Sequence, residues 1–122
     1  RDAEGYFFVV DRKKNMFISG GENVYPAEIE KYLYTNEKIK EVAVIGVPDE
    51  KWGEVGKAFI VLNENVNADA NEFIEFCKGN LAKYKIPKHV VIVNEIPKTD
   101  AGKINKLKLL EIHQSTITKT NL

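Results

Sequence analysis

Two short and nearly uninterrupted apolar segments constrain the fold of this chain more than any other feature. Residues 41–47 are EVAVIGV, and residues 57–62 are KAFIVL. Apolar runs of this length without polar alternation are typical of strands that are buried on both faces. Pro48-Asp49 is expected to end the first strand, and a polar loop at residues 63–67 follows the second. The sequence therefore predicts a small central sheet flanked by helices.

Helical spacing of apolar residues predicts three helices. The first begins at Pro26, because a proline at the first helical position lacks only an N–H that would be unpaired there anyway, and it ends near Asn36. The second follows Asp69, which together with Glu72 resembles a capping box. A short last helix is expected at residues 104–112. The apolar residues that define the three buried faces are Ile29, Tyr32 and Leu33; Phe73, Cys77 and Leu81; and Ile104, Leu107 and Leu110.

Three further extended segments complete the predicted architecture. Residues 6–10 and 16–19 are expected to pair as a hairpin, and Gly20-Gly21 then forms a loop that leads to the first helix. Residues 90–93 are expected to form a third central strand. The fold class is therefore α+β, with a central sheet of about three strands flanked by helices and an N-terminal β-hairpin.

Length and composition limit the class of protein. The 122 residues suit one domain, expected at residues 1–114 with residues 115–122 as a frayed tail. The 18 basic and 18 acidic residues balance, which argues against a dedicated nucleic-acid binder. The single cysteine, Cys77, excludes an internal disulfide framework, so a reducing, cytoplasmic location is expected. No apolar run approaches the roughly 18 residues of a membrane span, and no secretory signal is recognised.

Metal chemistry is not predicted. The two histidines, His89 and His113, have no partner at metal-ligand spacing, and Cys77 lies on an apolar helix face. A core position is the simplest interpretation of that thiol.

The strongest candidate for chemistry is Lys103, in the loop TDAGKINK at residues 99–106. A glycine directly before the lysine lets the loop bend, so that the ammonium can reach a phosphate or carboxylate as a mobile point charge. The segment is not a P-loop, because Pro97 and Ile104 stand where that motif needs glycine and Ser/Thr. The ordinary alternative is a solvated loop lysine.

Two further candidates lie near the N-terminus. Gly20 and Gly21 allow a ligand to approach the backbone closely, although an ordinary turn is the simpler interpretation. Arg12, in DRKK, can donate a fork of hydrogen bonds to ribose or phosphate oxygens, or it can pair with Asp11 within its own turn.

Two aromatic residues in polar loops are candidates for nucleotide contacts. Trp52 lies in PDEKWGEV, and Tyr84 lies in AKYKIPK beside Lys83, Lys85 and Lys88. An aromatic ring can stack on a base while the ammonium groups meet the phosphates. The alternative is that Trp52 covers the edge of the core and that Tyr84 ends a helix.

Four motifs in a fixed order carry a resemblance to a known family. They are GYFFVVDRKKNMFISGGENVYPAEIE, VAVIGVPDEKWGEVGKAFIVL, LAKYKIPK and IPKTDAGKINK. Over residues 5–110 the chain resembles the C-terminal domain of adenylate-forming acyl-CoA synthetases, a superfamily that includes luciferases and the adenylation domains of peptide synthetases. The residues of these motifs resemble those of fatty-acyl and aryl-CoA ligases more closely than those of acetyl-CoA synthetases.

The resemblance implies an ATP-dependent, AMP-forming ligase reaction in two steps. A small carboxylic acid reacts with ATP to give acyl-AMP and pyrophosphate, and the thiol of CoA then displaces AMP. In this family a small C-terminal lid rotates between two poses on a large N-terminal adenylation domain. That domain is missing from this chain, so the chain is expected to be inactive alone. Mg²⁺ is expected with ATP and would be bound mainly by the missing domain.

The resemblance also implies roles for particular residues. Lys103 resembles the lysine that reaches the active site during adenylation. Arg12 resembles the arginine that contacts the ribose, and Lys14 stands at the hinge position. Gly20 and Gly21 match the loop that lines the pantetheine tunnel. The positions matching aromatic and basic residues near the CoA nucleotide are Trp52, Tyr84, Lys85 and Lys88.

One departure and two rival functions remain. Asn15 stands where many acyl-CoA synthetases have aspartate, a change that we expect to be tolerated. The first rival is a noncatalytic module that binds a nucleotide or a partner protein. The second is an adenylating enzyme that serves the thiol of a carrier protein instead of CoA.

Overall fold

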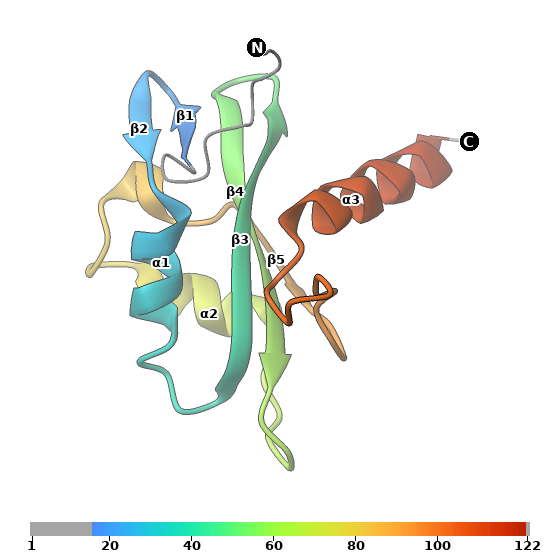
Figure 1. Ribbon diagram of the computed structural model, residues 1–122. Coiled ribbons are helices and arrows are strands. Elements are labelled where there is room, and N and C mark those ends of the chain that lie inside the picture. Colours follow the sequence, from blue (N-terminus) through green and yellow to red (C-terminus); the bar gives the residue numbers. More distant parts are fainter. Residues whose placement is uncertain (1–15, 122) are drawn as a thin grey trace.

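The computed structural model describes residues 16–121, with side chains described for residues 16–113. The segment at residues 6–10, expected as the first strand of a hairpin, lies outside the described residues. The elements are β1 Phe17–Ser19, β2 Glu22–Val24, α1 Pro26–Leu33, β3 Ile39–Asp49, β4 Gly53–Leu62, α2 Ala70–Cys77, the 3₁₀ turn η2 Lys83–Lys85, β5 His89–Ile92 and α3 Lys106–Asn121 (Figure 1).

The sheet is built on the long antiparallel pair of β3 and β4, whose register runs from Ile39 opposite Leu62 to Asp49 opposite Gly53. The other edge of β4 pairs with β5 in parallel. The first residue of β4 also pairs with β1, and β1 in turn pairs with β2. The three predicted central strands are therefore present. β1 and β2, which form a hairpin with each other, join the same sheet, so that five strands of the described residues belong to it.

β3 ends at Pro48-Asp49, as predicted. Pro48 still lies within the strand because, among the described residues, β3 is an edge strand on which a missing N–H costs no ladder bond. The prediction for the end of the short strand β1 is wrong. Gly20 and Gly21 do not lead directly into the first helix, since β2 intervenes. They form the two-residue turn of the β1–β2 hairpin with φ values of 59° and 84°, which a type I′ turn requires.

Helices cover both faces of the sheet, as the uninterrupted apolar runs predict (Figure 1). Alternate residues of β3 point to opposite sides. Val42 and Val44 join the cluster under α1 and α2 with Ile29, Ile60 and Phe73. The opposite cluster lies under α3 and consists of Ala43, Ile45, Val47, Val55, Phe59, Val61, Ile96 and Leu109.

The starts of α1 and α2 follow their sequence signals. Pro26 is at the start of α1, and the Asp69 side chain accepts a hydrogen bond of 2.9 Å from the N–H of Glu72. However, α2 ends at Cys77, four residues before the predicted contact at Leu81, because the chain turns at Gly79 with a φ of 84°. Leu81 is half-buried against the same cluster.

The predicted face of the last helix is wrong at Leu107, which is 71% exposed, whereas Ile104 and Leu110 pack against the cluster under α3. Ile104 pairs with Lys98 in an isolated bridge, and the Asn105 side chain accepts a hydrogen bond of 3.0 Å from the N–H of Lys108. Because the helix therefore starts after Asn105, its buried apolar residue among those described is Leu109. The helical backbone continues to Asn121 and includes most of the segment that the sequence predicts as a frayed tail.

The free edge of β3 is protected by side chains of and beside α1. The N–H of Val42 donates to the hydroxyl oxygen of Tyr34 at 3.2 Å, and the N–H of Val44 donates to Oε2 of Glu30 at 2.8 Å. Unpaired edge N–H groups are a template for unwanted strand pairing. Here α1 satisfies two of them and fixes its own position against the sheet.

No helix among residues 16–121 combines the length and apolar character that crossing a membrane would need.

A glycine pair makes room for the hairpin on the sheet. Gly46 and Gly56 lie opposite each other on β3 and β4, and Phe17 of β1 packs over them. A Cβ on Gly46 would lie 2.6 Å from Cγ of Phe17, which is closer than real Cβ contacts.

We expect Gly46→Ala to lower the free energy of unfolding by about 1–3 kcal/mol, because the methyl group overpacks the core beneath Phe17. Urea unfolding followed by circular dichroism measures the change. Adding Phe17→Leu should lessen the loss by relieving the clash. Unchanged stability in Gly46→Ala would show that Phe17 does not rest on this glycine.

A buried polar pair joins β4 to α3. Nζ of Lys57 lies 2.7 Å from Nδ1 of His113, and these residues are only 9% and 8% exposed. An ammonium only donates, so Nδ1 accepts and the imidazole is neutral. Burial, followed by the charges of Lys57 and His89, lowers the pKa of His113 below its ordinary 6.5, and burial also lowers the pKa of Lys57.

Acidification should therefore weaken the fold through His113. Below pH 6.5 the unfolded chain takes up a proton that the folded imidazole refuses, so stability falls from pH 6.5 down to the lowered pKa. His113→Asn, which can still accept a hydrogen bond from Lys57 but does not titrate, should flatten the loss of unfolding free energy between about pH 7 and 5. The control is His89→Asn, which should retain most of the slope. Equal slopes for wild type and His113→Asn would contradict the assignment.

Candidate functional site

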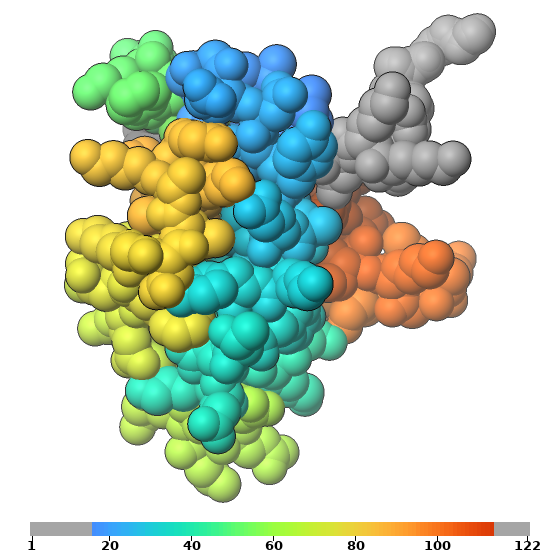
Figure 2. All heavy atoms as spheres, turned by 90° about the vertical axis from the view of Figure 1, so that its left-hand side faces the viewer, coloured from blue at the N-terminus to red at the C-terminus, as the bar shows by residue number. Residues whose placement is uncertain are grey.

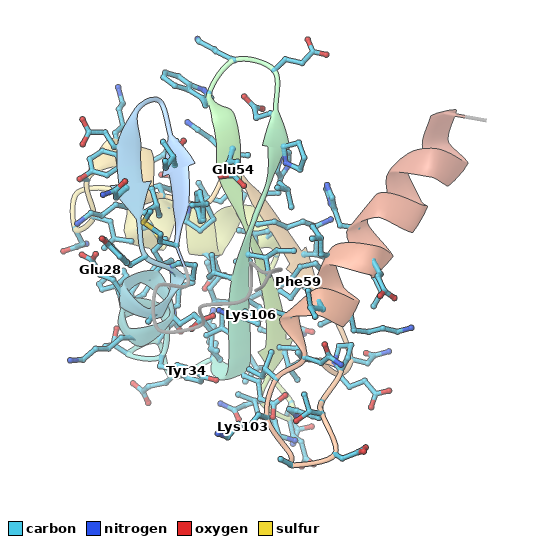
Figure 3. The ribbon with its side chains drawn as sticks, turned by 45° about the horizontal axis from the view of Figure 1, so that its top comes forward. Glu28, Tyr34, Glu54, Phe59, Lys103 and Lys106 are labelled. Carbon is cyan, nitrogen blue, oxygen red and sulfur yellow. The ribbon has the colours of Figure 1, made fainter. Side chains whose placement is uncertain are left out.

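Lys103 lies exposed on a narrow loop that is closed by its own hydrogen bonds. The Lys98–Ile104 bridge forms the base of the loop. Above it the N–H of Thr99 donates to the carbonyl of Lys103 at 2.6 Å, and the N–H of Gly102 donates to the carbonyl of Thr99 at 2.8 Å. Thr99 Oγ1 also accepts from the N–H of Lys103 at 3.3 Å. The backbone at Lys103 is thus held while its side chain extends outward (Figure 3).

The ammonium of Lys103 forms no hydrogen bond or ion pair with any other described side chain. An exposed and unpaired ammonium is what a lysine needs in order to reach a ligand outside its own domain.

Arg12 and Lys14, for which the resemblance implies ribose and hinge roles, lie outside the described residues.

The two turn glycines differ in their surroundings. The N–H of Gly20 donates to the carbonyl of Trp52 at 2.9 Å, and a Cβ on Gly20 would lie 2.8 Å from Cε3 of the indole. A Cβ on Gly21 would meet nothing within 4 Å. Gly20 is therefore needed for the packing of Trp52, and only Gly21 presents its bare backbone to the space outside the domain.

Trp52 combines an anchored backbone with an accessible ring. Oδ2 of Asp49 accepts hydrogen bonds from the N–H groups of Lys51 and Trp52 at 3.0 and 2.9 Å, which shapes the turn between β3 and β4. The indole is 40% exposed, with the ammonium groups of Lys51 and Lys88 at 4.9 and 5.8 Å from the ring centroid. Sequence reasoning missed Lys51, although its place beside the tryptophan was a usable signal.

Tyr84 and Lys85 lie on η2, where the lysine is already paired. Nζ of Lys85 contacts Oε2 of Glu28 at 2.9 Å and lies 5.8 Å from the Tyr84 ring centroid. The hydrogen bond to Glu28 raises the pKa of Lys85. The Tyr84 ring is 38% exposed. Of the two lysines assigned to CoA, Lys88 therefore lies at Trp52, whereas Lys85 is tied to α1.

A shallow hollow of about 430 Å³ adjoins Lys88. It is lined by the lysines Lys78, Lys83 and Lys88 and by apolar residues that include Ile74, Leu81 and Pro87. Figure 2 shows the blue hairpin, the green β3–β4 turn and the amber segment that holds η2 side by side on one face. The glycine turn, the exposed indole and several ammonium groups are thus brought together.

Lys103 belongs to a different place. Lys98, at the base of its loop, pairs at 2.9 Å with Glu41 near the start of β3, whereas Trp52 follows the end of that strand. Figure 1 accordingly shows the loop before α3 beside the half of the sheet that lies away from the hairpin. The candidate residues therefore form two separate sites on one small body.

Among the described residues, no three carboxylate, imidazole or thiol side chains gather in a way that could hold a metal ion.

Comparison with known proteins identifies the family. The model of the AMP-binding enzyme C-terminal domain matches residues 28–103, which include most of α1, all of β3, β4 and β5, and Lys103. The chain belongs to this family. Its assignment agrees with the resemblance found in the four sequence motifs.

The similar proteins are ligases and synthetases of much greater length. A 2-succinylbenzoate–CoA ligase of Listeria monocytogenes is 53% identical over 92% of this chain, and the long-chain-fatty-acid–CoA ligase FadD13 of Mycobacterium tuberculosis is 48% identical over 97%. These matches span only 24% and 23% of those two proteins. The chain thus corresponds to about a quarter of their length.

Solved structures agree with the fold. A fatty acyl CoA synthetase of Mycobacterium tuberculosis superposes with a TM-score of 0.78 at 48% identity, covering 94% of this chain and 23% of that chain. MatB of Rhodopseudomonas palustris gives a TM-score of 0.81 at 37% identity, covering 86% of this chain and 21% of that chain.

Proposed function

We propose that this chain serves as the rotating C-terminal lid of an ATP-dependent acid–CoA ligase, and that its two separate sites serve the two half-reactions. The observation that carries the proposal is the placement of an exposed Lys103 and of the Gly21–Trp52 site at opposite ends of the sheet. A carboxylate and ATP give acyl-AMP and pyrophosphate, and CoA then gives acyl-CoA and AMP. One face would be presented to a larger adenylation domain in each step.

Lys103 serves the first half-reaction in this proposal. Its ammonium enters the active site of the partner domain and offsets the negative charge that develops on the α-phosphate and carboxylate oxygens. The loop suits this task because its backbone is fixed by Thr99 and Gly102 while the ammonium remains available. Arg12 would contact the ribose, and Lys14 would lie at the hinge between the domains.

Lys103→Ala in the whole ligase should slow acyl-AMP formation by two or more decades, on the order of 3 kcal/mol, because a preorganised charge is removed from the transition state. Single-turnover release of pyrophosphate measures this step. Thioester formation from supplied acyl-AMP should stay close to wild type. A comparable loss in both steps would refute the role of Lys103.

A variant at Gly21 tests the Gly21–Trp52 site. Gly21→Asn adds bulk toward open space, and asparagine tolerates the left-handed backbone better than other residues. It should slow thioester formation while largely sparing adenylation. The same pattern in both variants would contradict the division of labour.

The second face supplies the CoA contacts. The pantetheine arm would pass the bare backbone at Gly21, and the adenine would stack at Trp52 or Tyr84. Lys88, together with Lys51, would meet the phosphates beside the hollow, in place of Lys85, whose ammonium is held by Glu28. This cluster of an accessible indole and ammonium groups favours CoA over a carrier-protein thiol as the acceptor.

Lys88→Met should raise the KM for CoA by about tenfold, since a charged contact with phosphate is worth about 1.5–3 kcal/mol at most. The KM for ATP and for the acid should not change. Lys31→Met, on the exposed side of α1, is the matched control. An unchanged KM for CoA in both Lys88→Met and Trp52→Ala would favour the carrier-protein alternative.

The substrates follow from the reaction class. The similar proteins are named for 2-succinylbenzoate, long-chain fatty acids and feruloyl-CoA, so a fatty or aryl acid is proposed. Mg²⁺ would arrive with ATP and be held mainly by the adenylation domain. Use of ATP and CoA and the buried free thiol of Cys77 fit a cytoplasmic enzyme.

A further inference from the structure

One carboxylate of α1 connects three parts of the molecule. Oε2 of Glu30 accepts the edge N–H of Val44 at 2.8 Å and also contacts Nζ of Lys106 at 2.8 Å. The Glu30 and Lys106 side chains are only 19% and 27% exposed. Lys106 is the first residue of α3, so this contact ties α1 and the edge of β3 to the start of the last helix.

That position is three residues beyond Lys103. The base of the loop is fixed by the N–H of Asn105, which donates to the carbonyl of Pro97 at 2.8 Å, and by the Lys98–Ile104 bridge. Figure 3 shows Lys106 between α1 and the start of α3, with Lys103 farther out on the loop. A shift of Lys106 would therefore move the base from which Lys103 extends.

The loop has little else to hold it in place. Every residue from 98 to 103 is exposed, and the nearest buried side chains are Ile96 before the loop and Leu109 after it. Ile104, at the base of the loop, is half-buried against the cluster under α3, whereas residues 98–103 themselves depend on polar contacts for their position. The second anchor, Lys98 with Glu41 at 2.9 Å, is more exposed, with side-chain exposures of 36% and 29%. The better shielded Glu30–Lys106 pair is the stronger restraint.

We propose that Glu30 and Lys106 are positioning residues for adenylation, which act by fixing the loop so that Lys103 is delivered at the correct place and angle. This proposal rests on the role of Lys103 proposed above. A misplacement of about 1 Å at a reacting centre can cost up to about a hundredfold in rate, so a pair that touches no substrate can still limit the reaction.

The test uses Glu30→Gln, Lys106→Met and the double variant in the whole ligase. Glutamine keeps an oxygen for the N–H of Val44 but loses the charge that holds Lys106, and methionine keeps the apolar stem of the lysine. Each single variant should slow acyl-AMP formation by about tenfold and leave thioester formation from supplied acyl-AMP within about twofold of wild type. The double variant should be no slower than either single variant, because both remove the same contact.

Two further variants separate positioning from general stability. Glu72→Gln breaks the Lys38–Glu72 ion pair of 2.7 Å, which lies in neither site, and should leave both half-reactions unchanged. Lys106→Arg keeps the charge and should restore most of the adenylation rate. Urea unfolding of each variant confirms that it is folded at the assay temperature.

The outcomes distinguish this inference from the proposed function. If Lys103→Ala slows adenylation selectively but Glu30→Gln and Lys106→Met adenylate at the wild-type rate, the positioning role is overturned and the function stands. If both half-reactions fall together in Glu30→Gln, the pair is merely structural and the inference fails. If Lys103→Ala is itself unselective, the function fails and the inference fails with it.

Discussion

The unpaired edge of β3 is the constraint on which the rest of this structure depends. β3 is buried on both faces, yet among residues 16–121 it pairs only with β4, so its outward N–H groups need other partners, which side chains supply. Tyr34 and Glu30 meet Val42 and Val44, which sets the position of α1 against the sheet. The same oxygen of Glu30 then reaches Lys106. The side chain that satisfies the edge of β3 thereby also ties the start of the last helix to α1.

The length of the β3–β4 pair separates the Lys103 loop from Trp52. β3 has 11 residues. Strands rise about 3.3 Å per residue, so its two ends lie about 30 Å apart. The Lys103 loop is tied near one end at Glu41, and Trp52 follows the other end. This separation supports the proposed alternation, in which each end of the domain would face the adenylation domain in a different step.

The sequence predicted those features that depend on neighbouring residues. Apolar runs located β3 and β4, and Pro26 and Asp69 located the starts of two helices. Leu107 was wrongly placed on the buried face of α3 because the bridge between Lys98 and Ile104 keeps the chain extended for two residues longer than the apolar spacing suggests. Lys103 was selected because a glycine precedes it; the structure shows that it is exposed, and its role stays a prediction. The Glu30–Lys106 contact was out of reach, since nothing local relates residues 76 positions apart.

The ion pairs also explain how a chain without net charge can present positive charge to a ligand at particular lysines. Lys85, Lys98 and Lys106 are each paired with a carboxylate of α1 or β3, which offsets part of the positive charge that they could present to a ligand. Lys103 is under no such restraint among the described residues. Since an ammonium that is already paired contributes little to a new anion, the useful positive charge is set by which lysines the acidic residues leave unpaired. The acidic residues of α1 thus pair with Lys85 and Lys106, whereas Lys103, in the proposed function, keeps its charge for a ligand outside the domain.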